Sequence, residues 1–230
     1  MTQRSILAGQ VPNVIIKAGG SVTVKGHHSD LVTAEAANRW GLKVEKRSES
    51  EIGRARAAVG EHVLFDVRLK WPDQEEKSAS DEVIEVQIGG SGQVFVPFKS
   101  NVKIYAGKDI AAEGIYGQVD AYAGYKLDLQ DVHFLRYASA GWTMKLDCHT
   151  LVEDKVEFKA GSVIRFHIQE LTSAHIRVKD IGGYWEARIG EGEKSISLKC
   201  GGDVTLVTDQ KVEPLPPDYI LGKIEKPAEA

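Results

Sequence analysis

Aromatic residues recur at a fixed spacing in the middle of the chain. Tyr105 and Tyr122 are seventeen residues apart, and Tyr125 and Trp142 are separated by the same interval. Neighbouring strands lie about 4.8 Å apart, so rings repeated at one place on successive strands stack into a ladder. Such a ladder stabilises the face it lies on, packs beneath another segment, or offers a platform to a sugar ring or a protein partner. These four residues are the candidate ligand or partner surface.

Histidines and cysteines do not follow a metal-binding pattern. His27 and His28 are adjacent, as are Cys148 and His149. Adjacent residues of a strand point to opposite faces, and no further ligand stands at zinc-like spacing. We therefore predict neither a metal site nor a cofactor, and we interpret Cys148 and Cys200 as reduced core residues. Three other histidines are interpreted as solvent-facing or strand-end residues, namely His133, His167 and His175.

Carboxylates that perform acid–base catalysis have to converge in a cleft. Asp109, Asp128 and Glu186 stand at outward positions, but Lys126 and Lys145 occupy the same positions of adjoining segments. Alternating charges on neighbouring strands are typical of ordinary cross-strand pairing. We therefore predict that the protein is not an enzyme.

A repeat anchored on glycine positions these residues. The pattern is apolar-x-apolar-x-small-Gly, and it occurs at 14–19, 102–107, 119–124, 156–161 and 196–201. Looser copies end at Gly89, Gly141 and Gly182, and from Gly89 to Gly201 the spacings are 18, 17, 17, 20, 21 and 19 residues. We interpret each copy as one coil of a repeat structure.

Apolar and polar residues alternate on either side of each glycine. A period of two over this length predicts strands with one buried face. Arg136, Arg177 and Lys179 break the alternation, but apolar residues stand one position earlier, which indicates one-residue bulges.

The glycine suits a tight corner that needs a positive φ or a close approach of two backbones. A phosphate-binding loop is excluded, because neither Gly19-Gly20 nor Gly201-Gly202 is followed by a helical pattern or by Lys-Ser/Thr.

The predicted fold is all-β, a parallel β-solenoid of about eight irregular coils, and the alternative is an antiparallel β-sandwich. Residues 1–207 form one repeat-built domain, with an insertion at about 25–82. Within the insertion we expect a short helix over Asp30–Trp40, a strand around Val63–Leu69 and an exposed loop over 71–81.

Prolines crowd the last residues of the chain. Four of the seven lie in the tail, residues 208–230, which we expect to be extended and partly disordered rather than paired in a sheet. Tyr219–Leu221 are expected to fold back as a cap on the last coil, which is built on Ile196, Leu198, Val204 and Leu206.

Composition is that of an ordinary soluble protein. The 230 residues are 42% hydrophobic and 27% charged. A net charge of -4 and a pI near 6.0 exclude the basic field of a nucleic-acid-binding protein. Neither a signal peptide nor an apolar run of membrane-spanning length is seen, so we expect a cytoplasmic protein without membrane insertion.

Residues 93–110, followed by 117–124, carry a strand ending in proline and then Val-x-Val-type copies ending in glycine. This pattern resembles the bacterial putative-adhesin domain family of unknown function, over about residues 14–207. The resemblance implies a β-solenoid or elongated all-β fold and supplies no activity, cofactor or catalytic residue. In this chain, tyrosine and tryptophan replace small polar residues of the family pattern.

The expected function is a non-enzymatic structural or interaction scaffold that presents a repeated surface to protein partners or to itself. The alternative is a carbohydrate-binding, adhesin-like module that uses the outward aromatic ladder.

Overall fold

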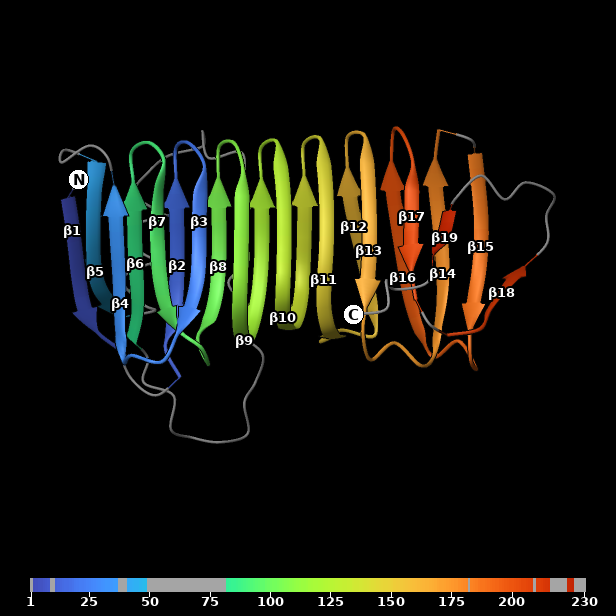
Figure 1. Ribbon diagram of the computed structural model, residues 1–230, viewed down its shortest axis with the longest axis horizontal. Coiled ribbons are helices and arrows are strands. Elements are labelled where there is room, and N and C mark those ends of the chain that lie inside the picture. Colours follow the sequence, from blue (N-terminus) through green and yellow to red (C-terminus); the bar gives the residue numbers. More distant parts are fainter. Residues whose placement is uncertain are drawn as a thin grey trace.

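Strands make up most of the part of the chain that the structure describes. The computed structural model describes residues 2–8, 11–36, 41–48, 82–181, 183–208, 210–215 and 223–225. Within these ranges nineteen strands belong to one mixed sheet (Figure 1), and no helix there is long and apolar enough to cross a membrane. The prediction of an all-β protein is confirmed. The strands are β1 (Thr2–Leu7), β2 (Asn13–Ala18), β3 (Val22–His27), β4 (Leu31–Ala36), β5 (Leu42–Ser48), β6 (Glu82–Ile88), β7 (Gly92–Pro97), β8 (Asn101–Ala106), β9 (Ile110–Ala123), β10 (Lys126–Ala140), β11 (Thr143–Leu151), β12 (Lys155–Ala160), β13 (Val163–Ile168), β14 (Ala174–Asp180), β15 (Gly183–Ile189), β16 (Lys194–Cys200), β17 (Val204–Val207), β18 (Val212–Leu215) and β19 (Lys223–Glu225).

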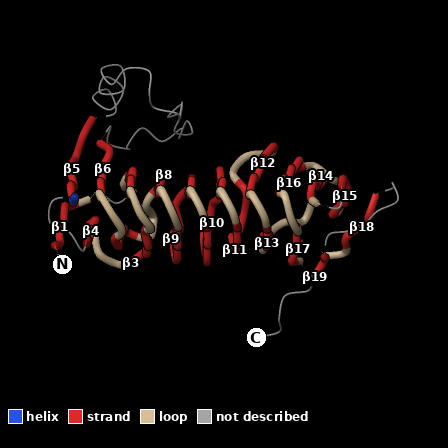
Figure 2. The backbone as a smooth tube through the Cα atoms, turned by 90° about the horizontal axis from the view of Figure 1, so that it is seen from above, coloured by secondary structure: helices blue, strands red, loops and turns tan. Residues whose placement is uncertain are grey.

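The strands lie in two rows joined by loops (Figure 2). The first row runs, in pairing order, through β5, β6, β2, β8, the C-terminal parts of β9 and β10, β12, β16, β14, β15 and β18. The second row runs through β1, β4, β7, β3, the N-terminal parts of β9 and β10, β11, β13, β17 and β19. Strands β9 and β10 are long enough to belong to both rows.

The core lies between the two rows. In β12 of the first row Val156 and Phe158 are buried, and Glu157 between them is partly exposed. In β13 of the second row Ile164 and Phe166 are likewise buried, and the rings of Phe158 and Phe166 meet with centroids 5.7 Å apart. The predicted alternation is therefore the alternation between core and outer surface.

Of the predicted one-residue bulges, the one at Arg136 is confirmed, whereas those at Arg177 and Lys179 are wrong because β14 pairs with β15 and β16 without a register shift. The pairing of β10 with β9 shifts register between Leu135 and Tyr137, which places the bulge at Arg136. In β14, Ile176 and Val178 are fully buried and the basic residues that flank them point outward.

Successive copies of the repeat pair in parallel and in register through the middle of the molecule. Val102 of β8 lies opposite Val119 of β9, and Tyr105 lies opposite Tyr122. The same holds from β9 to β10, although the register shifts twice there, between Val132 and Phe134 and between Leu135 and Tyr137. Residues at one offset from the glycine are therefore neighbours across the sheet.

The recurrence of glycine at the corners is explained by close contact between backbones. A Cβ on Gly124 would lie 2.1 Å from the carbonyl oxygen of Gly107, and one on Gly141 would lie 2.0 Å from that of Gly124. Neither glycine has a positive φ. Of the two reasons expected from the sequence, close approach is the one that applies here. Gly182 lies outside the described residues.

The spatial order of the copies departs from the chain order at both ends. Strand β2 lies between β6 and β8, so residues 13–18 are inserted between segments that follow them by more than sixty positions. At the other end β16 lies between β12 and β14. Further out, β4 pairs antiparallel with β7 and β15 pairs antiparallel with β14, whereas β19 pairs parallel with β17.

The helix expected over Asp30–Trp40 is wrong for the described part of that segment. Leu31–Ala36 is strand β4, in which Val32, Ala34 and Ala36 are buried. A period of two and the β-branched Val32 and Thr33 favour the strand over the helix. The strand expected around Val63 and the loop over 71–81 lie outside the described residues.

The C-terminal tail contributes two short strands, contrary to the expectation that prolines keep it unpaired. Strand β18 pairs antiparallel with β15, and Pro214 lies opposite Ala187. Among the described strands β18 pairs with β15 alone, and proline is tolerated on such an edge strand. Strand β19 pairs with β17 and covers the copy that carries Val204 and Leu206, whereas β16 is already flanked by β14. Residues 219–221 lie outside the described part.

Candidate functional site

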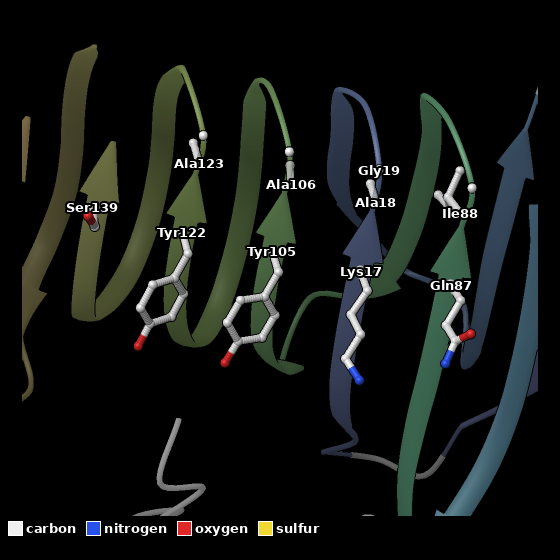
Figure 3. A pocket seen from close by; sticks show the side chains of 13 residues that line it. Lys17, Ala18, Gly19, Gln87, Ile88, Tyr105, Ala106, Tyr122, Ala123 and Ser139 are labelled. Atoms are coloured by element: carbon white, nitrogen blue, oxygen red, sulfur yellow. The ribbon is translucent and has the colours of Figure 1, made fainter. Parts of the chain in front are cut away.

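A groove of about 740 Å³ runs across the outer side of the first row. Its walls come from neighbouring strands, and it is open to solvent along β6, β2, β8, β9 and β10 (Figure 3). The side chains two positions before the glycines line one side, namely Gln87, Lys17, Tyr105, Tyr122 and Ser139. The other side consists of small and apolar residues next to the corner, namely Ala18, Ile88, Ala106 and Ala123, with their glycines. In-register pairing brings these equivalent positions together.

Tyr105 and Tyr122 stack as expected. Their centroids are 4.9 Å apart and their planes differ by 12°. Tyr137 extends the stack, with its ring 4.7 Å from that of Tyr122 and a 21° tilt. Ser139 lies directly opposite Tyr122, and Tyr137 lies opposite Asp120. Tyr137 therefore stands four positions before its glycine and stacks on Tyr122 diagonally across the two strands. The sequence analysis identified the bulge but missed Tyr137.

The stacked rings offer their edges, not their faces, to the groove. In Figure 3 the rings of Tyr105 and Tyr122 stand upright side by side, and each face of Tyr122 is covered by a neighbouring ring. Burial, with a contribution from the Asp120 carboxylate, raises the pKa of Tyr122 well above its ordinary value. The hydroxyl therefore stays protonated at neutral pH and remains a hydrogen-bond donor.

Buried charges lie next to the tyrosines. Asp120 accepts hydrogen bonds from Arg136 Nε at 2.8 Å and from Arg136 Nη2, and Lys103 Nζ lies 3.9 Å from Asp120 Oδ2. The side chains of Lys103 and Asp120 are 1% and 5% exposed. Hydrogen bonding to Asp120 raises the pKa of the Arg136 guanidinium. This group of charges fixes the outer surface of three neighbouring strands.

The opposite end of the groove carries a second ion pair. Lys17 donates to Glu85, which is nearly buried, and Arg47 Nε lies 3.3 Å from the other oxygen of the same carboxylate. Burial by itself would raise the pKa of Glu85, but hydrogen bonds from Lys17 and Gln87 lower it below its ordinary value. The carboxylate is thus ionised at neutral pH.

Tyr125 and Trp142 lie apart from the groove. They follow Gly124 and Gly141 directly, so they stand beyond the corner, and their centroids are 6.3 Å apart with planes differing by 14°. Their exposed fractions are 46% and 47%. The four aromatic residues predicted as one surface therefore form two separate pairs, and only Tyr105 and Tyr122 line the groove.

The carboxylates considered for catalysis lie in separate surface pairs. Lys145 Nζ is 3.7 Å from Asp128 Oδ1, which is the expected cross-strand pairing. Asp109 accepts hydrogen bonds from Ser21 and from the backbone of Lys126. A separate group elsewhere on the surface joins Glu186 to His175, Tyr184 and Arg177.

The two cysteines are free. Cys148 is fully buried, and burial together with the charge of Asp147 raises the pKa of its thiol. Cys200 is partly exposed, and burial raises its thiol pKa as well. Cys148 thus fits the expected core position, whereas Cys200 lies at the edge of the core.

No family model and no curated protein matches this chain. Among solved structures, the crystal structure of a "putative cell adhesion protein" from Clostridium sporogenes ATCC 15579 is similar at 8% identity and a TM-score of 0.38, over 98% of this chain and 99% of that one. Its description agrees in wording with the adhesin resemblance noted from the sequence. Similarity at this level supports neither a fold assignment nor a function.

Proposed function

We propose that this protein is a non-enzymatic interaction scaffold with a β-solenoid fold, and that the groove on the first row contacts a protein partner. The observation that carries the proposal is the open groove of about 740 Å³ built from equivalent positions of five strands. Parallel in-register pairing of successive copies supports the solenoid over the antiparallel sandwich.

The chemistry of the groove suits a protein surface. Tyrosine combines a large apolar area with a hydroxyl and is enriched in protein interfaces. Here tyrosine edges and hydroxyls lie opposite a floor of alanine and glycine, where a partner's side chains can approach the backbone closely. Lys17, which is paired with Glu85, makes the β6 side of the groove more polar than the tyrosine side.

A protein partner fits better than end-to-end self-association. Three of the described outermost strands, β1, β5 and β18, are poor templates for another chain. Strand β1 carries polar residues along most of its length, and β18 contains Pro214. Strand β5 carries Lys43, Lys46 and Arg47. Charge and proline at the edges oppose the addition of a further strand.

A matched pair of serines tests this proposal. Ser139 lines the groove, and Ser197 lies on the same row beyond it, with a similar partly buried environment. A photo-crosslinking amino acid at each position identifies the partner in cells by mass spectrometry. The affinity of that partner is then measured for the unmodified protein, Ser139→Arg and Ser197→Arg.

The proposal predicts crosslinks at position 139 that are absent at 197. It also predicts at least a tenfold loss of affinity in Ser139→Arg with little change in Ser197→Arg. Equal crosslinking at the two positions, or equal affinity of the two variants, contradicts the groove as the contact surface.

A carbohydrate site is the second candidate, and the exposure of Trp142 favours it. The equivalent position of the next copy is Ser162, so no large side chain follows Trp142 in the row. The ring of Tyr125 stacks on the other side. A glycan array tests this candidate with Trp142→Ala against Tyr184→Ala, a similarly exposed aromatic control. Glycan binding that both variants retain, or no glycan binding at all, excludes Trp142 as a sugar platform.

A further inference from the structure

A separate stack of aromatic and imidazole rings runs across the strands, away from the groove. It joins residues that are far apart in the sequence, with centroid separations of 4.6, 4.8, 4.1 and 4.2 Å between successive rings. In order, the rings are His28, Phe98, Tyr116, His133 and His149. This stack of rings therefore ends in two adjacent imidazoles.

Strand pairing places the two imidazoles side by side. Val132 of β10 lies opposite Cys148 of β11, and Phe134 lies opposite Thr150. The residues between these pairs, His133 and His149, are therefore direct neighbours on parallel strands. Both point outward, because Val132 and Cys148 are buried in the core.

A bulge turns a carboxylate toward the same place. The register between β10 and β11 shifts between Leu129 and Val132, and Asp131 within this bulge has a φ of 49°. Leu129 and Val132 are both buried, so plain alternation between them is impossible. The extra residue directs Asp131 outward beside His133, which is how bulges commonly re-aim a side chain.

Three donor atoms converge as a result. One ligand atom from each of Asp131, His133 and His149 lies within 4.8 Å of the others, and His149 Nε2 is 3.2 Å from Asp131 Oδ1. Zinc bonds of about 2.1 Å place tetrahedral ligands about 3.4 Å apart. Small rotations of these surface side chains bring the ligand atoms from their present separations to this distance.

We propose that Asp131, His133 and His149 bind a divalent transition-metal ion of the zinc class. Two imidazole nitrogens and one carboxylate oxygen suit Zn²⁺, Cu²⁺ or Ni²⁺ rather than Ca²⁺ or Mg²⁺, which prefer oxygen ligands. Stacking of His133 on Tyr116 orients one imidazole before the metal arrives. The remaining coordination positions face solvent and are open to water or to a ligand from another molecule.

The sequence analysis missed this site because it considered adjacent histidines. His133 and His149 are sixteen residues apart, and only parallel pairing with a bulge brings them together with Asp131. The nearby pair of Asp147 and His167, with 3.0 Å between Oδ1 and Nδ1, offers two donors instead of three. It therefore serves as an internal control.

Titration of the full chain with Zn²⁺ tests the proposal, with binding followed by calorimetry and by competition with a colorimetric chelator. We expect one equivalent to bind the unmodified protein. His149→Ala and Asp131→Asn should each weaken binding by at least about tenfold, whereas His167→Ala should leave it unchanged. Asparagine also tolerates the left-handed backbone of residue 131, so Asp131→Asn removes the ligand without straining the bulge.

Visible absorption of the Co²⁺-substituted protein adds a readout of geometry. The intense band of low-coordinate Co²⁺ should appear in the unmodified protein and in His167→Ala, and should be lost in His149→Ala. The proposal is overturned if the unmodified protein binds no stoichiometric metal, or if His167→Ala and His149→Ala lose affinity equally. Thermal unfolding without metal confirms that each variant is folded.

Discussion

The outer surfaces of the two rows differ in how far their charged side chains are exposed to water. On the first row Asp120 is 5% exposed beside Arg136 and Lys103. On the second row Asp128 and Lys145 form a pair with side chains 42% and 49% exposed. Both aspartates stand at outward positions of neighbouring copies. Alternation therefore decides which side of the sheet a residue occupies, but it does not decide whether water reaches that residue.

The energetic meaning of a charge pair follows from this difference. Removing one member of a buried pair leaves the other charge in a medium of low dielectric, whereas water screens an exposed pair. The following substitutions test how far the two rows differ.

Asp120→Ala should have the largest effect. It removes the carboxylate that Arg136 and Lys103 approach, and loss of one partner of a buried ion pair costs about 3–5 kcal/mol. The free energy of unfolding in urea measures this cost. A loss below about 1 kcal/mol would mean that water screens this pair as it does an exposed one.

Tyr122→Ala should have the second largest effect. The ring lies between Tyr105 and Tyr137, and aromatic pairs contribute about 0.5–1.5 kcal/mol each beyond buried area. We expect a loss of about 2–3 kcal/mol, against less than about 1 kcal/mol for Tyr125→Ala at the exposed pair. Denaturant unfolding of both variants measures the difference, and equal losses would remove the distinction between the two aromatic pairs.

Acidification should lower the stability of the folded protein through Glu85, which lies on the first row. Its pKa in the folded protein lies below the ordinary value of 4.5, so the folded state favours the ionised carboxylate. The resulting stability is present above pH 4.5 and is lost as the pH falls through the lower folded pKa.

Comparison with Glu85→Gln isolates this contribution. The stability advantage of the unmodified protein over Glu85→Gln should be constant at neutral pH and should shrink below pH 4.5. Urea unfolding at a series of pH values measures it. An advantage that stays the same, or grows, on acidification contradicts the assigned ion pairs with Lys17 and Arg47.

Asp128→Ala should have the smallest effect. Exposed ion pairs contribute about 0–1 kcal/mol, and salt screens them further. The difference in unfolding free energy from the unmodified protein should vanish in high salt, whereas the cost of Asp120→Ala should persist. A loss above about 2 kcal/mol would show that the second row also holds its outward charges away from water.

Much of the fold could be predicted from local sequence pattern. The alternation around each glycine identified the core faces, such as Val156 and Phe158 in β12. The break in alternation at Arg136 identified a real register shift. The glycine spacing identified the corners, because each corner backbone packs so closely against the next that a Cβ would clash there. All three signals are local, so the amino-acid sequence alone contains them.

The candidate sites were predicted only in part. Tyr105 and Tyr122 were identified because regular spacing and in-register pairing agree at those residues. Tyr137 was missed because it stacks on Tyr122 diagonally and does not lie opposite it. Asp131 was missed because it lies in a bulge that moves it out of its expected position. The short helix expected where β4 lies was wrong, because helix propensity over eleven residues is outweighed by pairing with a partner strand on each side.

By itself the sequence determined the all-β class, the period of two and the side of the sheet on which most residues lie. These properties depend on neighbours in the chain, and backbone geometry translates them directly into structure. Tertiary structure alone decided that residues 13–18 lie between β6 and β8, that Asp120 is buried while Asp128 is exposed, and that Asp131 meets two histidines. Each of these outcomes depends on which distant strands become neighbours and what covers them. The free energy that selects those neighbours is shared among many contacts, so no short segment of the sequence encodes it.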